Sequence, residues 1–237
     1  MSSELRKYVL TVKQKDEAAL QKAGSAWAIT AARNRLGYEI DWFGVPIIQT
    51  PEDIVLMQEL MYELKPDVIV EIGIAHGGGA IFYASLLELL GRGKVIGVDI
   101  EIRKHNREVL EKHPFFKRIE LLEGSSITTT MVEEVKKKIP AGATVLVCLD
   151  SNHTRDHVLK ELQLYSPLVS SGSYIVVFDT MTSELAEAGA ADSMYLNNGP
   201  LEAIHLFLQE NDCFQIDKSY NKLVIGQANN GFLKRVK

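Results

Sequence analysis

The chain has 237 residues, of which 46% are hydrophobic and 24% are charged, and its formal net charge at pH 7 is −5. This length suits an α/β fold with one core, and the acidic balance argues against a general nucleic-acid binder, which normally carries a basic surface. No apolar run approaches the ~20 residues of a membrane span, residues 1–7 lack the apolar stretch of a signal peptide, and the two cysteines have no metal or redox spacing. We therefore expect a cytoplasmic protein with reduced thiols.

The first 50 residues predict a helical extension that precedes a domain over residues 51–237. Residues 16–34 are rich in alanine and predict a helix, and Thr50 with Pro51 predicts the start of the next one, which continues to about Leu64. We interpret the extension as a lid or a dimer element. Tyr38 and Trp42 are expected to anchor it to the core, although either ring suits stacking on a sugar.

Strands and helices are expected to alternate through the middle of the chain. The predicted strands are residues 67–72, 94–99, 118–122, 144–149 and 173–178, and the helices between and after them are 79–91, 104–112, 129–138 and 154–165. Strands separated by helices of this length form parallel sheets. After a helix at 200–210, the tail predicts strands at 213–217, 221–226 and 231–236. The expected fold is a doubly wound, Rossmann-like, mostly parallel sheet that ends in an antiparallel hairpin.

A glycine-rich turn follows the first of these strands and contains Gly73, Gly77, Gly78 and Gly79. Strand, tight turn and helix in this order hold nucleotide-like ligands in α/β sheets, because glycine lets the backbone approach the ligand closely. The turn lacks the Lys-Ser or Lys-Thr of a phosphate loop and does not match the dinucleotide fingerprint.

Glu71 precedes the turn, and its carboxylate suits a ligand that carries a cation. S-adenosylmethionine carries a sulfonium and an ammonium, and E-x-G-x-x-x-G resembles the first motif of class I methyltransferases. His76 inside the turn either contacts the carboxylate of this donor or serves as a spacer.

The ends of the next two strands offer further ligand-binding groups. Asp99 is placed to bind ribose hydroxyls, with a helix N-cap as the alternative. Gly124, Ser125 and Ser126 follow the third strand, where the edge of adenine is commonly read in this fold. The alternative is that one of the two serines caps the helix that starts near Thr128.

Two later strands each end in an aspartate, Asp150 and Asp179, which predicts paired carboxylates above the sheet. Such a pair repels itself unless a proton or cation lies between, and Mg²⁺ prefers oxygen ligands of this kind. His153 is expected to enter the same pocket as a base for a substrate hydroxyl. The alternative is that both aspartates cap helices. His157, one helical turn further, either extends a proton relay or is a solvated helix residue.

Four segments carry a family resemblance: residues 42–48, 71–78, 149–154 and 168–174. They resemble the cephalosporin hydroxylase family, whose members are similar to S-adenosylmethionine-dependent O-methyltransferases, among them a cephamycin-pathway enzyme and rhamnosyl O-methyltransferases. The likeness runs from about residue 38 to residue 235.

The resemblance implies a class I methyltransferase fold, a methyl donor at the glycine turn and an Mg²⁺-assisted reaction on a hydroxyl of a sugar, glycan or natural product. Asp150 and Asp179 would be metal ligands, with Asp150 also bordering the donor, and His153 would be the base. No nucleic-acid partner and no membrane span are expected, whereas a homo-oligomer is possible.

The chain departs from related patterns at three places. Phe178 stands where some relatives have a second acid, and Thr180 stands where catechol-type enzymes have an amide ligand. Residues 182–198 contain many small side chains and are expected to form a flexible loop over the acceptor. Two alternatives stay open: a metal-dependent hydroxylase with a ligand set of two histidines and a carboxylate, and a donor-binding module without catalysis.

Overall fold

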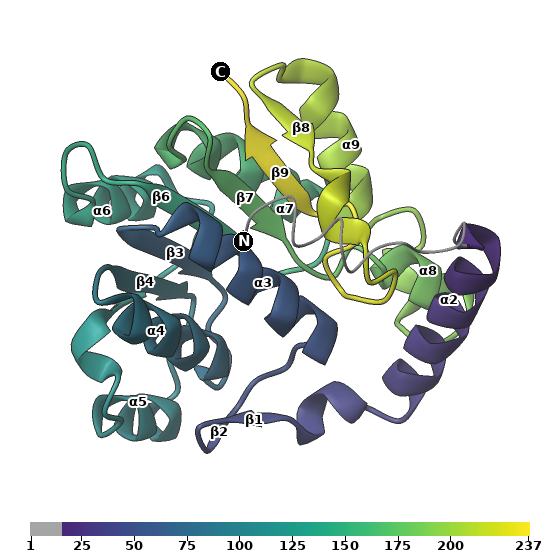
Figure 1. Cartoon of the computed structure of the whole chain (residues 1–237), viewed down its shortest axis with the longest axis horizontal. Helices are drawn as coiled ribbons and strands as arrows, with labels where there is room; N and C mark the ends of the chain where they lie inside the picture. Colours follow the sequence, from purple (N-terminus) through teal and green to yellow (C-terminus); the bar gives the residue numbers. More distant parts are fainter. Residues whose placement is uncertain (1–15) are drawn as a thin grey trace, which may run out of the picture.

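We describe the protein from a computed structural model in which residues 16–237 are placed (Figure 1). Its centre is a seven-stranded sheet in the order β5-β4-β3-β6-β7-β9-β8. The strands are β3 (Val68–Ile72), β4 (Lys94–Asp99), β5 (Ile119–Glu123), β6 (Val145–Leu149), β7 (Tyr174–Val177), β8 (Phe214–Ile216) and β9 (Phe232–Arg235). The strands β3 to β7 are parallel, and β9 is antiparallel to both of its neighbours. The predicted fold class is confirmed.

Helices cover both faces of the sheet (Figure 1). They are α3 (Pro51–Leu64), α4 (Gly78–Leu90), α5 (Lys104–Glu111), α6 (Thr129–Lys138), α7 (Arg155–Tyr165), α8 (Thr182–Glu187) and α9 (Pro200–Glu210). Because side chains alternate along a strand, Leu146 and Cys148 pack toward α3 and α4, whereas Val147 packs toward α6, α7 and α9. Glu71 pairs in register with Cys148, which places the Glu71 carboxylate on the α4 side.

The predicted strand at 221–226 is wrong. The chain there leaves a short 3₁₀ helix, η5 (Lys218–Asn221), and continues as a loop in which Val224 has a φ of 68°. The apolar side chains that suggested a strand pack on a helix instead, since a methyl group added at Gly24 would lie 3.3 Å from both Val224 and Ile225. This loop, residues 217–231, therefore runs from the sheet toward the amino-terminal extension.

The extension consists of α2 (Glu17–Arg33), η1 (Leu36–Glu39) and a small antiparallel pair, β1 (Asp41–Trp42) and β2 (Val45–Pro46). Trp42 anchors it as expected, because its Nε1 donates to Ser85 Oγ at 3.1 Å and its ring meets the edge of Phe82. The same expectation is wrong for Tyr38, which is 55% exposed.

The helix α2 lies at the edge of the molecule beside α8 (Figure 1), where Arg33 donates to the carbonyl of Ala188 at 2.6 Å. The domain boundary near residue 50 stays a prediction. The expectations for residues 1–15, including the lack of a signal peptide, lie outside the described residues. Among residues 16–237, no helix combines the length and apolar character needed to cross a membrane.

Candidate active site

Two adjoining cavities lie at the carboxyl ends of the parallel strands. The larger has a volume of about 520 Å³ and the smaller about 340 Å³. Both are lined by Gly73, Ala75, Asp150 and Ser151. An extended ligand can therefore reach from one cavity into the other across the ends of β3 and β6.

The glycine turn is dictated by the protein's own packing. Gly73 has a φ of 91°, and a Cβ there would lie 2.0 Å from the carbonyl oxygen of Asp150. A Cβ at Gly78 would lie 2.2 Å from the carbonyl oxygen of Pro46, in the extension. The sequence interpretation explains these glycines by the close approach of a ligand. In the structure, the atoms that leave no room for a Cβ belong to other parts of the chain. Gly77, also in the turn, has a φ of 95°.

Two hydrogen-bond acceptors in the larger cavity receive no hydrogen bond from the described residues. Glu71 is 4% exposed and Gln49 is 3% exposed, and within residues 16–237 neither Oε2 of the glutamate nor Oε1 of the glutamine has a partner. Burial, followed by the charges of Asp150 and Asp99, raises the pKa of Glu71 well above its usual value. Two orphaned buried acceptors lining one cavity suit a ligand that brings N–H donors or a positive charge.

Gln49 was missed from the sequence, because nothing about a lone glutamine before a helix marks it as a binding residue. His76 also lines this cavity. No described contact decides between its two expected roles.

Asp99 lies at the end of β4 and lines the smaller cavity. Its Oδ2 accepts from the backbone N–H of Ile74 at 2.8 Å and of Ala75 at 3.1 Å, so it holds the glycine turn in place. The N-cap alternative is excluded, since the N-cap of α5 is Arg103. Ribose binding stays a prediction and would use the remaining lone pairs of this carboxylate.

Ser125 and Ser126 line the same smaller cavity, after Gly124 with its φ of 151°. Neither serine caps α6, because Thr128 is the N-cap and accepts from the N–H of Met131. The hydroxyl of Ser126 donates to Glu161 Oε1 at 2.5 Å. Their expected role toward adenine stays a prediction.

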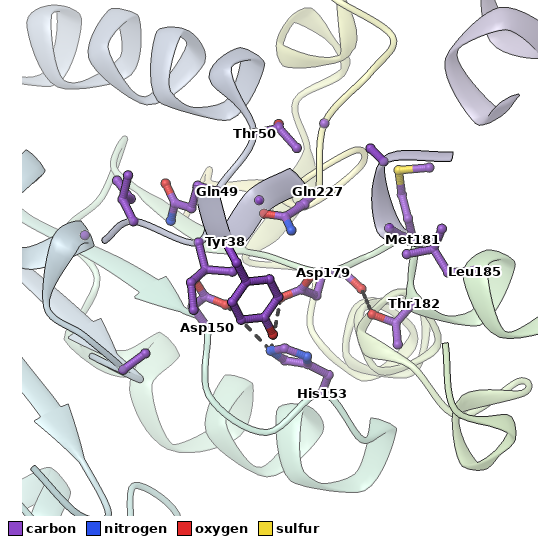
Figure 2. A pocket seen from close by; sticks show the side chains of 18 of the residues that line it. Tyr38, Gln49, Thr50, Asp150, His153, Asp179, Met181, Thr182, Leu185 and Gln227 are labelled. Carbon is purple, nitrogen blue, oxygen red and sulfur yellow. Dashed lines mark hydrogen bonds and ion pairs between the residues drawn. The ribbon is translucent and has the colours of Figure 1, made fainter. Parts of the chain in front are cut away.

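Asp150, His153 and Asp179 converge in the larger cavity (Figure 2), where one potential ligand atom from each lies within 4.8 Å of the others. His153 Nε2 is 3.0 Å from Asp179 Oδ2 and 3.6 Å from Asp150 Oδ1. Neither aspartate caps a helix, since the N-caps of α7 and α8 are Thr154 and Met181. The expected grouping of these three side chains is confirmed, and their roles stay predictions.

The charges in this cluster shift the pKa values of its members. Burial alone would lower the pKa of His153, but Asp179 and then Asp150 outweigh it and raise that pKa to about 9. Burial raises the pKa of Asp179 to about 7, against the opposing effect of His153. The carboxyl groups of the cluster therefore favour a positive charge beside them, in the place that a divalent cation would suit.

The two unusual residues beside Asp179 do not face the cluster. Phe178 is buried in the core. The Thr180 hydroxyl donates to the carbonyls of Gln227 at 2.9 Å and Asn229 at 2.7 Å. Neither supplies a further metal ligand.

Residues 182–198 are not wholly a loop, because they contain α8 and the 3₁₀ helix η4 (Ser193–Tyr195). They nevertheless line the larger cavity, as expected of an acceptor-covering segment. Side chains of α2 form the facing wall, and the lining residues from the two segments are Trp27, Ala28, Ala31, Ala32, Thr182, Leu185, Ala190, Ala191 and Tyr195. This end of the cavity is mainly apolar.

Comparison with known proteins decides the family. The sequence model of the family described as Rhamnosyl O-methyltransferase/CmcI matches residues 34–236, most of the chain. The chain belongs to this family. The expected resemblance is confirmed, since this is the group of cephalosporin hydroxylase-like proteins whose motifs the sequence carries.

Relatives within the Rhamnosyl O-methyltransferase/CmcI family include the Rhamnosyl O-methyltransferase of Mycobacterium tuberculosis, which is 30% identical over 201 residues, 82% of this chain and 77% of that protein. The Rhamnosyl O-methyltransferase of Mycobacterium leprae is 29% identical over 204 residues, 82% of each chain. A solved structure of CmcI with Mg and SAM superposes with a TM-score of 0.58 at 20% identity, over 84% of this chain and 78% of that one. This last likeness supports the fold.

Proposed function

We propose that the protein is an S-adenosylmethionine-dependent O-methyltransferase that acts on a hydroxyl of a sugar, glycan or natural product. The observation that carries this proposal is the shared lining of the two cavities, which brings the orphaned Glu71 and Gln49 next to the cluster of Asp150, His153 and Asp179. A cation-binding pocket beside a carboxylate–imidazole cluster suits a sulfonium donor and an acceptor hydroxyl.

The donor would span both cavities. S-adenosylmethionine supplies the methyl group on a sulfonium, which needs no activation by the protein. Glu71 and Gln49 would accept from its ammonium group, and Asp99 would bind its ribose hydroxyls. Ser126 would face its adenine at the far end of the smaller cavity.

The donor set of the cluster suits a divalent cation. Asp150 and Asp179 would hold Mg²⁺, which when bound would lower the pKa of the acceptor hydroxyl and fix its position. His153 lies against both carboxylates. Its neutral imidazole is placed to accept the proton of that hydroxyl. The apolar cavity wall of α2 and α8 would exclude water from the reaction.

Rhamnosyl relatives favour a glycoside as the acceptor. The hydroxylase alternative has no support from the geometry, because the one described cluster of potential metal ligands contains His153 without His157. His157 instead contacts Glu161 at 3.1 Å. The cytoplasmic location and a homo-oligomeric state are part of this proposal.

Calorimetry with S-adenosylhomocysteine tests donor binding, and mass spectrometry of a panel of rhamnosides incubated with S-adenosylmethionine and Mg²⁺ tests transfer. We expect micromolar-range binding and a gain of one methyl group on at least one acceptor, with no binding of 2-oxoglutarate. Asp150→Asn is the matched control for transfer and should abolish the mass gain. Binding of 2-oxoglutarate without S-adenosylhomocysteine would overturn the proposal in favour of the hydroxylase. Donor binding without transfer to any hydroxyl acceptor would instead favour the non-catalytic alternative.

A further inference from the structure

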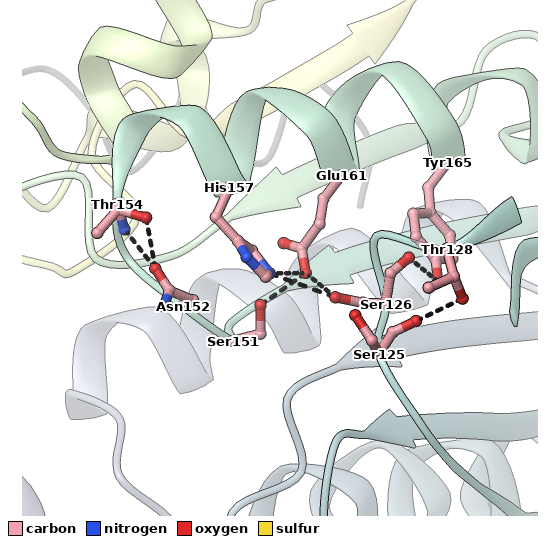
Figure 3. A network of polar contacts seen from close by, with 9 residues as sticks. All are labelled: Ser125, Ser126, Thr128, Ser151, Asn152, Thr154, His157, Glu161 and Tyr165. Carbon is pink, nitrogen blue, oxygen red and sulfur yellow. Dashed lines mark hydrogen bonds and ion pairs between the residues drawn. The ribbon is translucent and has the colours of Figure 1, made fainter.

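A buried carboxylate lies at the centre of a network of polar contacts (Figure 3). Glu161 on α7 is 0% exposed, and its Oε1 is the centre of a polar network. The hydroxyls of Ser126 and Ser151 donate to it at 2.5 and 2.6 Å, and His157 Nε2 lies 3.1 Å away. The three partners of Glu161 line the cavity, whereas Glu161 itself does not.

The network fixes the direction of each hydroxyl. A serine hydroxyl has one hydrogen to donate and two lone pairs to accept with. Since Glu161 takes the hydrogen of both Ser126 and Ser151, each oxygen can offer the cavity only lone pairs. His157 Nε2 lies 3.1 Å from Glu161 Oε1 and 3.3 Å from Ser126 Oγ, so this ring nitrogen contacts the network and not the ligand side of the hydroxyls.

Toward the cavity, the hydroxyls of Ser126 and Ser151 are therefore acceptors. A ligand edge that fits them must bring N–H donors. The 6-amino group of adenine is such a donor, whereas the 6-oxo group of hypoxanthine is an acceptor that would meet the two serine oxygens with no hydrogen between them.

We propose that Glu161 is a positioning residue that makes the donor site selective for a 6-aminopurine over a 6-oxopurine. It does so without touching the ligand, by orienting the hydroxyls of Ser126 and Ser151. This inference rests on the proposed function, because it requires that the smaller cavity binds the purine of a nucleoside donor.

A purely structural role predicts a different result. The network also ties α7 to the strand ends, and the Tyr165 hydroxyl donates to the Ser126 carbonyl at 3.0 Å in the same region. Loss of a structural tie would weaken both purines alike. Loss of hydroxyl orientation changes the ratio of their affinities, since only the donor–acceptor match is affected.

The test is calorimetric titration of the full chain with S-adenosylhomocysteine and with S-inosylhomocysteine, its 6-oxo analogue. The wild type should bind the adenine compound at least about tenfold more tightly. Glu161→Gln should reduce this ratio about tenfold, because an amide can donate to the serines and free their hydrogens for the cavity. Ser126→Ala should reduce the ratio too, and it keeps the test valid if Glu161→Gln does not fold.

Tyr165→Phe is the matched control. It removes a hydrogen bond to Ser126 but leaves the hydroxyl orientation in place, so the ratio should not change. Equal affinity of the wild type for both compounds, or an unchanged ratio in folded Glu161→Gln, would overturn the inference while leaving the proposed function intact. Failure to bind either compound would overturn both.

Discussion

The candidate site contains acidic groups whose partners are missing or shared. Glu71 has an unpartnered carboxylate oxygen in the interior, and Asp150 and Asp179 share one imidazole. A buried charge without a partner lowers stability, and such groups persist where a ligand supplies the missing charge. At the scale of single residues, the site is therefore recognised by its buried acidic groups, which lack enough hydrogen-bond donors and positive charge.

Replacing Glu71 by Gln should separate stability from binding. Burial is the largest cause of its raised pKa, so the neutral amide should stabilise the ligand-free protein and raise Tm by about 2 °C or more. Affinity for S-adenosylhomocysteine should fall by about 1–3 kcal/mol, because a charge-assisted contact is lost. Thermal unfolding and calorimetry measure the two effects.

Glu120→Gln is the control for this variant. Glu120 is a carboxylate of strand β5, which β4 separates from the strand of Glu71, and it already pairs with Lys94 and Lys138 at 2.6 Å. Its replacement should therefore neither stabilise the protein nor weaken donor binding. Tighter donor binding by Glu71→Gln would show that this carboxylate does not face the ammonium.

His153 should require high pH to act as a base in the metal-free protein. Asp179 is the first of the charges that raise its pKa to about 9, so the ring is protonated below that pH and gains the ability to accept a proton as pH rises through it. Asp179→Asn should move this titration to lower pH, as followed by NMR of the imidazole.

His153→Ala should lower kcat by about two orders of magnitude and leave donor affinity unchanged, because the general base is lost and the donor pocket is not. Turnover assays and calorimetry measure the two quantities.

Asp156→Asn is a matched control for this titration, since Asp156 is an exposed carboxylate of α7 that pairs with Arg155. Its replacement should leave the His153 titration in place. The same pH for the titration in Asp179→Asn and wild type would mean that Asp179 does not set the protonation of the ring.

At the scale of elements, helix α2 makes few contacts with the rest of the described residues. Gly24 is its one buried residue, where it meets the loop 217–231, and Arg33 bonds to Ala188 after α8. Between these points its alanines line the larger cavity. Few buried contacts on a long helix are typical of an element that opens at low cost.

Arg33→Ala should loosen α2 without disturbing the sheet. Loss of an exposed hydrogen bond of about 0.5–1.5 kcal/mol should speed amide exchange in α2 roughly two- to tenfold, and exchange in β3 should not change. Hydrogen-exchange mass spectrometry measures both segments. Arg35→Ala is the control, because the Arg35 guanidinium lies over the Tyr38 ring at 4.7 Å and does not bond to the segment after α8. Its replacement should leave amide exchange in α2 unchanged. Equal exchange of α2 in Arg33→Ala and wild type would mean that Gly24 alone fastens the helix.

At the scale of the whole molecule, the sheet sets the distance between donor and acceptor. The strands β3 and β4 carry the turn and Asp99, while β6 and β7 lead to Asp150 and Asp179. Parallel strands end at one edge, so groups far apart in the sequence meet there. The two cavities consequently adjoin but draw on largely different side chains.

Removal of the metal should therefore stop methyl transfer without weakening donor binding. A chelator should abolish methyl transfer and leave affinity for S-adenosylhomocysteine within about twofold, because the donor contacts proposed for Glu71, Gln49 and Asp99 do not use the cation. Turnover assays and calorimetry in excess chelator measure this, with Mg²⁺ restored as the control. Full turnover without metal would mean that His153 alone activates the hydroxyl. It would also mean that Phe178, which replaces an acid of some relatives, is typical of enzymes that work without a metal.

Local sequence patterns were enough to predict the order of elements and the groups at the strand ends. Periodicity and turn residues are local, so the strands β3 to β9, the glycine turn, Asp99, Asp150 and Asp179 were found within a residue or two of their observed places, whereas the strand predicted at 221–226 is absent from the described residues. The pairing of His153 with both aspartates also followed, because its spacing from Asp150 and the parallel sheet leave it little choice of position.

Contacts between segments that share no sequence pattern could not be predicted and depend on the packing of the whole chain. Gln49 joins Glu71 in one cavity, Glu161 orients serines from two other strand ends, and Val224 packs on α2 instead of forming a strand. In each case the partner lies at least ten residues away in the sequence, and burial against that partner, rather than local propensity, selects the conformation. These contacts can therefore be identified only in the folded structure of the whole chain.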